Sequence, residues 1–137
     1  MAVLAAVPPL RRASAASSSS GSPDNVNLAT AFTASTPTTN VLDRGPSMGP
    51  VLIKIVSTIG ATPTVTVAVE GSADGTNWLP VAYATSAVPE TPTVATFAIT
   101  TATTTYVIVR PNVPVRYIRL NLSANTNVTL TVDAWPF

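Results

Sequence analysis

The residue types that most enzymes use to move protons or hold metals are scarce in this chain. Its 137 residues include no histidine, no cysteine, six acidic side chains and a single lysine, Lys54. A serine or threonine nucleophile needs a base that takes its proton, and no serine stands in an obvious relation to Lys54. A Ser–Lys dyad is the only nucleophile–base pair left open, and we expect no catalytic residue.

The acidic side chains are the remaining candidates for chemistry. Glycoside hydrolysis, for example, needs two carboxylates held several ångströms apart. The sequence pattern places all six acids in turns or on outward strand faces, where they act as solvated charges and turn formers: Asp24, Asp43, Glu70, Asp74, Glu90 and Asp133.

One acid, Asp74, lies in the segment Ala73-Asp74-Gly75-Thr76-Asn77, which is weakly similar to a calcium loop. A calcium loop ends in a bidentate acid, and this segment has none downstream. The Asp-Gly pair instead predicts a tight hairpin turn, because glycine adopts positive φ at little cost. The glycines also form no phosphate-binding spacing. We therefore expect no metal and no cofactor.

The composition of the chain limits the classes of partner that it can bind. The formal net charge is +1, so no basic field is available to attract nucleic acid or an anionic membrane surface. No apolar run approaches the 18 or so residues of a membrane-spanning helix. Only 9% of the residues are charged, against about a quarter in typical soluble domains. Because charge keeps monomers apart, this composition favours a subunit of an assembly.

The first 25 residues differ from the rest and predict an extended arm. An apolar tip is followed by two arginines and then by the Ser/Ala-rich tether 13–23. Two alternatives stay open, a signal peptide and a frayed terminus, although the arginines follow the apolar stretch instead of preceding it. We expect the arm to contact other proteins through Val3, Leu4, Val7, Leu10, Arg11 and Arg12.

Residues 26–137 read as a single β domain. Short runs alternate apolar and polar residues and are separated by Pro, Gly and Asp-Gly turn signals, and no window shows helical periodicity. This pattern predicts an all-β, antiparallel, jelly-roll-like β-sandwich of about eight or nine strands. The expected strands are 26–33, 37–43, 51–58, 64–70, 78–85, 94–99, 105–110, 115–122 and 127–135.

Three arginines, Arg110, Arg116 and Arg119, form the densest positive group. They predict either a small anion- or partner-binding patch or a structural role, with Arg116 paired to Glu70, Asp74 or Asp133. The C-terminal Trp135 and Phe137 either close the core or form an exposed apolar anchor.

Two segments carry a resemblance to a known class of proteins. Val69 to Trp78 (VEGSADGTNW) and the later Val115 to Leu120 (VRYIRL) resemble a pattern in small structural proteins of tailed bacteriophages. The similarity covers roughly residues 51–132 and leaves the N-terminal arm unmatched. The second segment is also similar to a strand of discoidin-like carbohydrate-binding domains.

The resemblance implies a non-enzymatic virion structural protein on the particle exterior. The leading expectation is a capsid decoration (cement) or minor capsid protein that binds the major capsid protein or other virion proteins and forms a homo-oligomer, a trimer above all. Two alternatives are a tail, neck or baseplate component and a carbohydrate-binding module for host attachment, with Trp78 or Tyr117 in contact with the sugar.

Overall fold

The computed structural model describes residues 25–46 and 48–137, so the expected arm contacts at positions 3, 4, 7, 10, 11 and 12 lie outside the described residues. The described part contains strands and no helix, which confirms the all-β prediction. All strand pairs are antiparallel and belong to one continuous sheet. Its eight strands are β1 (Val26–Phe32), β2 (Leu42–Asp43), β3 (Val51–Ser72), β4 (Leu79–Pro80), β5 (Tyr83–Thr85), β6 (Phe97–Ile99), β7 (Thr104–Val109) and β8 (Tyr117–Pro136).

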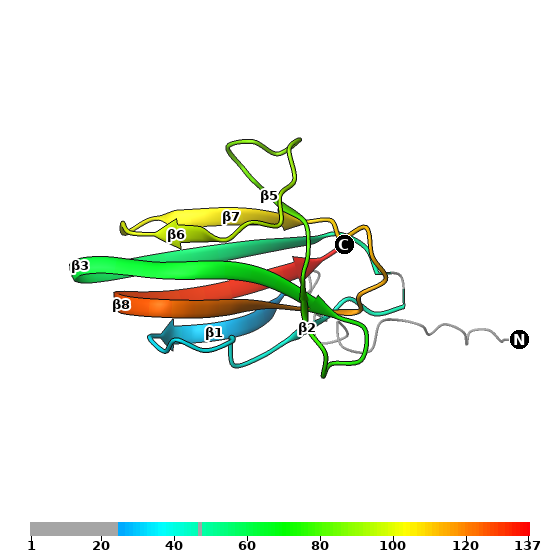
Figure 1. Cartoon of the computed structure of the whole chain (residues 1–137), viewed down its shortest axis with the longest axis horizontal. Coiled ribbons are helices and arrows are strands. Elements are labelled where there is room, and N and C mark those ends of the chain that lie inside the picture. Colours follow the sequence, from blue (N-terminus) through cyan, green and yellow to red (C-terminus); the bar gives the residue numbers. More distant parts are fainter. Residues whose placement is uncertain (1–24, 47) are drawn as a thin grey trace, which may run out of the picture.

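The two longest strands, β3 and β8, fold the sheet over on itself. Each runs to one end of the molecule, bends and returns, and both bends lie at the same end (Figure 1). The register between the two strands shifts at the bends, between Ile59 and Thr66 of β3. Positive φ angles at Thr62, Ala124 and Asn127 let the backbone turn this corner.

The sequence pattern was wrong in treating 51–58 and 64–70, and likewise 115–122 and 127–135, as separate strands. The chain turns the corner without leaving the hydrogen-bonded ladder, because Thr64 still pairs with Thr126 beside the bend. Turn-forming residues therefore mark a bend within a strand here and not its end.

The bends generate two packed layers. The first layer has the order β1–β8–β3–β7–β5 and uses the first half of β3 and the second half of β8. The second uses the other halves and has the order β2–β8–β3–β6, with β4 beside β6 on the same edge. If each half is counted as a strand, ten strands form two layers of five, which is the antiparallel β-sandwich expected from the sequence, with one or two strands more than the predicted eight or nine.

The core lies between the layers and is made of aliphatic side chains from alternating positions. Along β3, buried residues alternate with half-buried ones on both sides of the bend, as period-two geometry requires. The largest fully buried side chains are Leu28, Leu42, Ile53, Ile55, Ile118, Leu120, Leu122 and Leu130.

Three expected strands are shorter or divided in the structure, and one of them, 94–99, keeps only β6. The segment 37–43 keeps only β2 and a bridge between Pro37 and Asn121, because residues 36–40 cross one open side of the sandwich. There the amide of Thr38 donates to Leu120 (2.9 Å) and that of Asn40 donates to Leu28 (3.0 Å). The segment 78–85 divides into β4, which pairs with β3 in the second layer, and β5, which pairs with β7 in the first.

Candidate functional site

The turn that follows β3 is organised by one carboxylate. Asp74 Oδ1 accepts hydrogen bonds from the amides of Thr76 and Asn77 (2.8 Å each) and from Ser72 Oγ (2.9 Å), and Oδ2 accepts from Asn77 Nδ2 (2.8 Å). Gly75 follows with φ of +79°, and β3 pairs with β4 across the turn. The predicted hairpin is therefore confirmed, but the turn is not a tight one, because residues 73–78 separate β3 from β4.

These donors lower the pKa of Asp74 well below its ordinary value, chiefly through the amides of Asn77 and Thr76. The hydrogen bonds of the carboxylate therefore stabilise the turn. Among the described residues, no group of three or more acidic, histidine or cysteine side chains comes together to hold a metal ion.

An aromatic and charged cluster lies beside this turn, on the outward face of the second layer. Glu70 and Arg119 are direct cross-strand partners, and the guanidinium donates from Nε to Glu70 Oε1 at 2.9 Å. Asn121 Nδ2 donates to the other carboxylate oxygen at 3.2 Å. The guanidinium carbon of Arg119 lies 4.0 Å from the ring centroid of Trp78, which is a cation–π contact.

This cluster joins the two segments that resemble phage structural proteins, 69–78 and 115–120. Glu70 and Trp78 belong to the first segment and Arg119 to the second, and the fold stacks the three together. One face of the Trp78 ring is occupied by the guanidinium, so that face is closed to a sugar. The residues at these positions are therefore explained by contacts within the chain.

A second ion pair joins Arg116 to Asp43. Arg116 Nε and Nη2 donate to the two carboxylate oxygens at 2.7 and 3.0 Å, and the guanidinium also lies 5.6 Å from the ring centroid of Tyr117. The Arg116 guanidinium lowers the pKa of Asp43. The expected partners of Arg116, which were Glu70, Asp74 and Asp133, were wrong, because β2 brings Asp43 opposite the start of β8.

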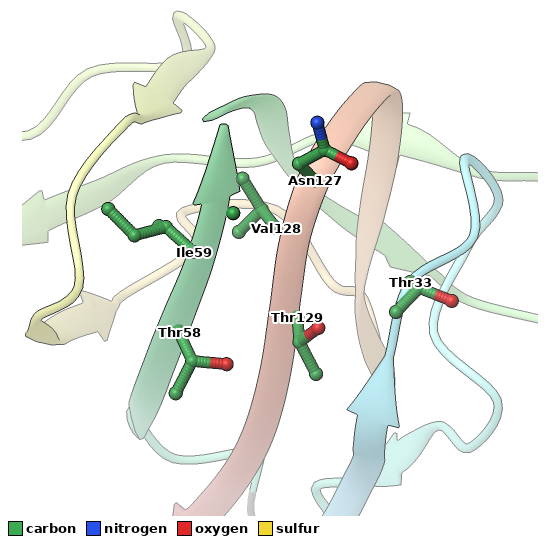
Figure 2. Close-up of a pocket in the computed structure, with 7 residues that line it drawn as sticks. Thr33, Thr58, Ile59, Asn127, Val128 and Thr129 are labelled. Carbon is green, nitrogen blue, oxygen red and sulfur yellow. The ribbon is translucent and has the colours of Figure 1, made fainter. Parts of the chain in front are cut away.

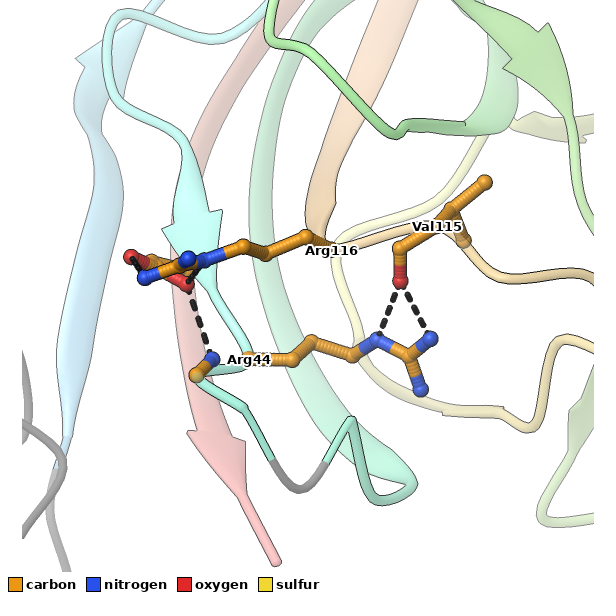
Figure 3. A network of polar contacts seen from close by, with 5 residues as sticks. Arg44, Val115 and Arg116 are labelled. Atoms are coloured by element: carbon orange, nitrogen blue, oxygen red, sulfur yellow. Dashed lines mark hydrogen bonds and ion pairs between the residues drawn. The ribbon is translucent and has the colours of Figure 1, made fainter.

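Arg44, which the sequence pattern did not single out, is buried with 3% of its surface exposed. Nε and Nη2 both donate to the carbonyl oxygen of Val115 (Figure 3), the former at 2.9 Å. Nη1 donates to the carbonyl oxygens of Met48 (2.6 Å) and Gly49 (2.7 Å). Burial lowers the pKa of this guanidinium, and its hydrogen bonds tie the loop before β3 to the chain that enters β8.

A groove of about 490 Å³ lies at the bend of β3 and β8. Thr33, Thr58 and Thr129 present hydroxyl groups there beside Ile59 and Asn127 (Figure 2). Its lining contains no acidic or basic side chain that could act as a general acid or base.

The other candidates are dispersed. Lys54 points outward from β3, whereas Ser57 is buried on the opposite face and donates to the carbonyl oxygen of Thr101 at 2.7 Å. Trp135 is half-buried, and Phe137 is the most exposed large hydrophobic residue of the described chain, at 66%.

Comparisons with protein-family models, with curated proteins and with solved structures found no match to this chain. Within residues 25–46 and 48–137, no helix is long and apolar enough to cross a bilayer.

We expect the free energy of unfolding to fall at acidic pH and to change little with pH near neutrality. A carboxyl group whose pKa is lowered by folding stabilises the folded state above its unfolded pKa, which is about 3.9, and loses this contribution as the pH falls through its folded pKa. Asp43 and Asp74 are such groups. The free energy of unfolding should therefore fall below about pH 4 and stay level between about pH 5 and 8, since the chain has no histidine or cysteine.

Urea unfolding at a series of pH values measures this dependence. Asp74→Asn should reduce the acid-dependent loss, whereas Glu90→Gln, at an exposed loop position, should leave it unchanged. An equal acid dependence in the Asp74 variant would contradict the role given to this turn.

Proposed function

We propose that this protein is a non-enzymatic structural component of a virus particle, a capsid decoration or minor capsid protein of a tailed bacteriophage. The observation that carries the proposal is a loop with two exposed valines that projects from a β-sandwich. Residues 86–96, between β5 and β6, project from the sandwich (Figure 1). Their two valines, Val88 and Val94, are 54% and 60% exposed.

Three further features favour a binding role over a catalytic one. The charged side chains of the Glu70–Arg119 and Asp43–Arg116 pairs are engaged with each other. The chain carries few charges overall. The jelly-roll-like sandwich expected from the sequence also fits this role, because jelly rolls are common in viral capsid proteins, and it agrees with the resemblance of the two sequence segments to phage structural proteins.

In this proposal, the projecting loop contacts the shell, and the arm of residues 1–25 adds a second contact. Each valine contributes about 1.5–3 kcal/mol if it becomes fully buried on binding. Exposed apolar side chains on a projecting loop suit such a contact, because the removal of apolar surface from water is favourable and no polar group has to be desolvated.

Electron microscopy with an antibody against this chain, applied to purified particles from the source organism, tests the proposal. Labelling on the particle surface is the expected result. Recovery of the chain only in the soluble fraction, away from any particle, would contradict the proposal.

The loop contact has its own prediction. The double variant Val88→Asp/Val94→Asp should reduce occupancy on particles at least tenfold, since two apolar contacts are replaced by charges that must be desolvated. The control Ser86→Asp/Thr91→Asp adds the same charge to the same loop at exposed polar positions. Equal loss of occupancy in both variants would show that added charge, and not the valines, decides binding.

A further inference from the structure

The outward face of the first layer is more apolar than a solvent-facing sheet surface requires. Along β3, the outward positions in this layer include Leu52 and Val56 on either side of Lys54. Leu52 stands directly between Ile108 of β7 and Trp135 of β8. These side chains are only half-buried, although alternation places them on the side of the sheet opposite the core.

A row that contains two charges crosses the middle of this face. In register, it reads Tyr106, Lys54, Asp133 and Asn27, from β7 to β1. Lys54 makes no hydrogen bond or ion pair among the described residues, whereas Asp133 accepts one hydrogen bond, from Asn27 Nδ2 at 3.0 Å. The face therefore presents an unpaired cation and an anion side by side, flanked by apolar side chains.

We infer that this face binds the same face of a second copy of the chain, about a two-fold axis. The axis lies between the two facing sheets, parallel to the strands and above the line midway between β3 and β8. Rotation about it places β3 of one copy over β8 of the other. It sets Lys54 of each copy over Asp133 of the other, and both ion pairs form at once. The contact is isologous, as in most homodimers.

The same operation matches the flanking rows. Leu52 of one copy faces Trp135 of the other, so apolar surface covers apolar surface, and Val56 faces Thr131. Packed sheets lie about 10 Å apart with strands nearly aligned, a distance that the extended side chains of lysine and aspartate can span together.

The inference goes beyond the proposed virion role and does not depend on it, because it rests only on the register of β3, β7 and β8. It favours two-fold association over the threefold association that the resemblance implies. Other occupants of the face, such as residues 1–24 of the same copy or a different protein, would leave the chain monomeric in solution.

Sedimentation equilibrium of the full-length chain tests the inference. The unmodified chain should form a dimer. Lys54→Glu alone and Asp133→Lys alone should each weaken the dimer roughly a hundredfold, because each places like charges over one another twice. An equimolar mixture of the two variants should restore a heterodimer of near-original affinity, since both contacts then join opposite charges.

The mixture distinguishes a lost contact between copies from a defect within one copy, because mixing restores only the contact between copies. Ala98→Glu, on an exposed position of β6 in the other layer, is the matched control and should leave the dimer unchanged. Leu52→Gln adds no charge and should weaken the dimer about tenfold, with an unchanged melting temperature in dilute solution, where both chains are monomeric.

A chain that stays monomeric at millimolar concentration, a trimer, or a mixture that fails to associate would overturn the inference. If one charge variant does not fold, the Leu52→Gln result decides alone: an unchanged dimer would overturn the inference in the same way.

Discussion

Replacing Arg44 with alanine will lower the free energy of unfolding by about 3–5 kcal/mol. The guanidinium is buried and donates to three backbone carbonyl oxygens, those of Met48, Gly49 and Val115. Its removal leaves these acceptors without donors and opens a cavity where the side chain lay. Urea unfolding at neutral pH measures the loss.

Arg44→Lys is the informative companion to this variant. Lysine keeps the positive charge but cannot reproduce the planar fork that serves acceptors on two sides, so roughly half of the loss should remain. Arg110→Ala is the control. Because Arg110 is exposed, this substitution should hardly change the free energy of unfolding. Full stability in Arg44→Lys would show that charge alone matters at this position.

The second large effect is expected at Gly71. A Cβ atom there would lie 2.8 Å from Val115 Cγ2 and 2.9 Å from Val81 Cγ1, and both valines are buried. Gly71→Ala should therefore destabilise the fold by about 1–3 kcal/mol through overpacking. The same unfolding measurement applies.

A compensating change tests the cause. Val115→Ala in the Gly71→Ala background removes the closest methyl group and should recover part of the loss, so the two substitutions are non-additive. Gly60→Ala, at an exposed position in the bend where the nearest atom would be Asn127 Cβ at 3.2 Å, should cost less. Strictly additive losses would rule out the steric explanation.

Both predictions concern the segments 69–78 and 115–120 and test how these two segments stabilise the fold. Gly71 lies in the first segment, near the end of β3, and Val115 is the first residue of the second segment and accepts the hydrogen bonds of Arg44. The two segments are therefore joined by packing as well as by the Glu70–Arg119–Trp78 contacts. The contacts of these two segments are explained by the stability of the hairpin, without a ligand.

Much of the fold could be predicted from the sequence because period-two alternation acts locally. Val65, Val67 and Val69 alternate with small or polar residues and are buried as expected. The hairpin turn at Asp74 was also predictable, since the conformations available to Asp-Gly depend on neighbouring residues alone.

The candidate site was less predictable, because its contacts join residues far apart in the sequence. The Glu70–Arg119 pair depends on the register between β3 and β8, and the Asp43–Arg116 pair depends on the short strand β2. The burial of Arg44 left no signal at all, since a lone arginine before a Gly-Pro pair is typical of an exposed loop.

The sequence by itself determined the class of fold, the positions of most strands and the scarcity of groups for chemistry, because composition and alternation are properties of the chain. Only the tertiary structure decided that β3 and β8 bend across both layers, which charges pair, and that Lys54 and Asp133 stand side by side on an apolar face. Those outcomes depend on strand register, and register is set by the packing of the whole core at once.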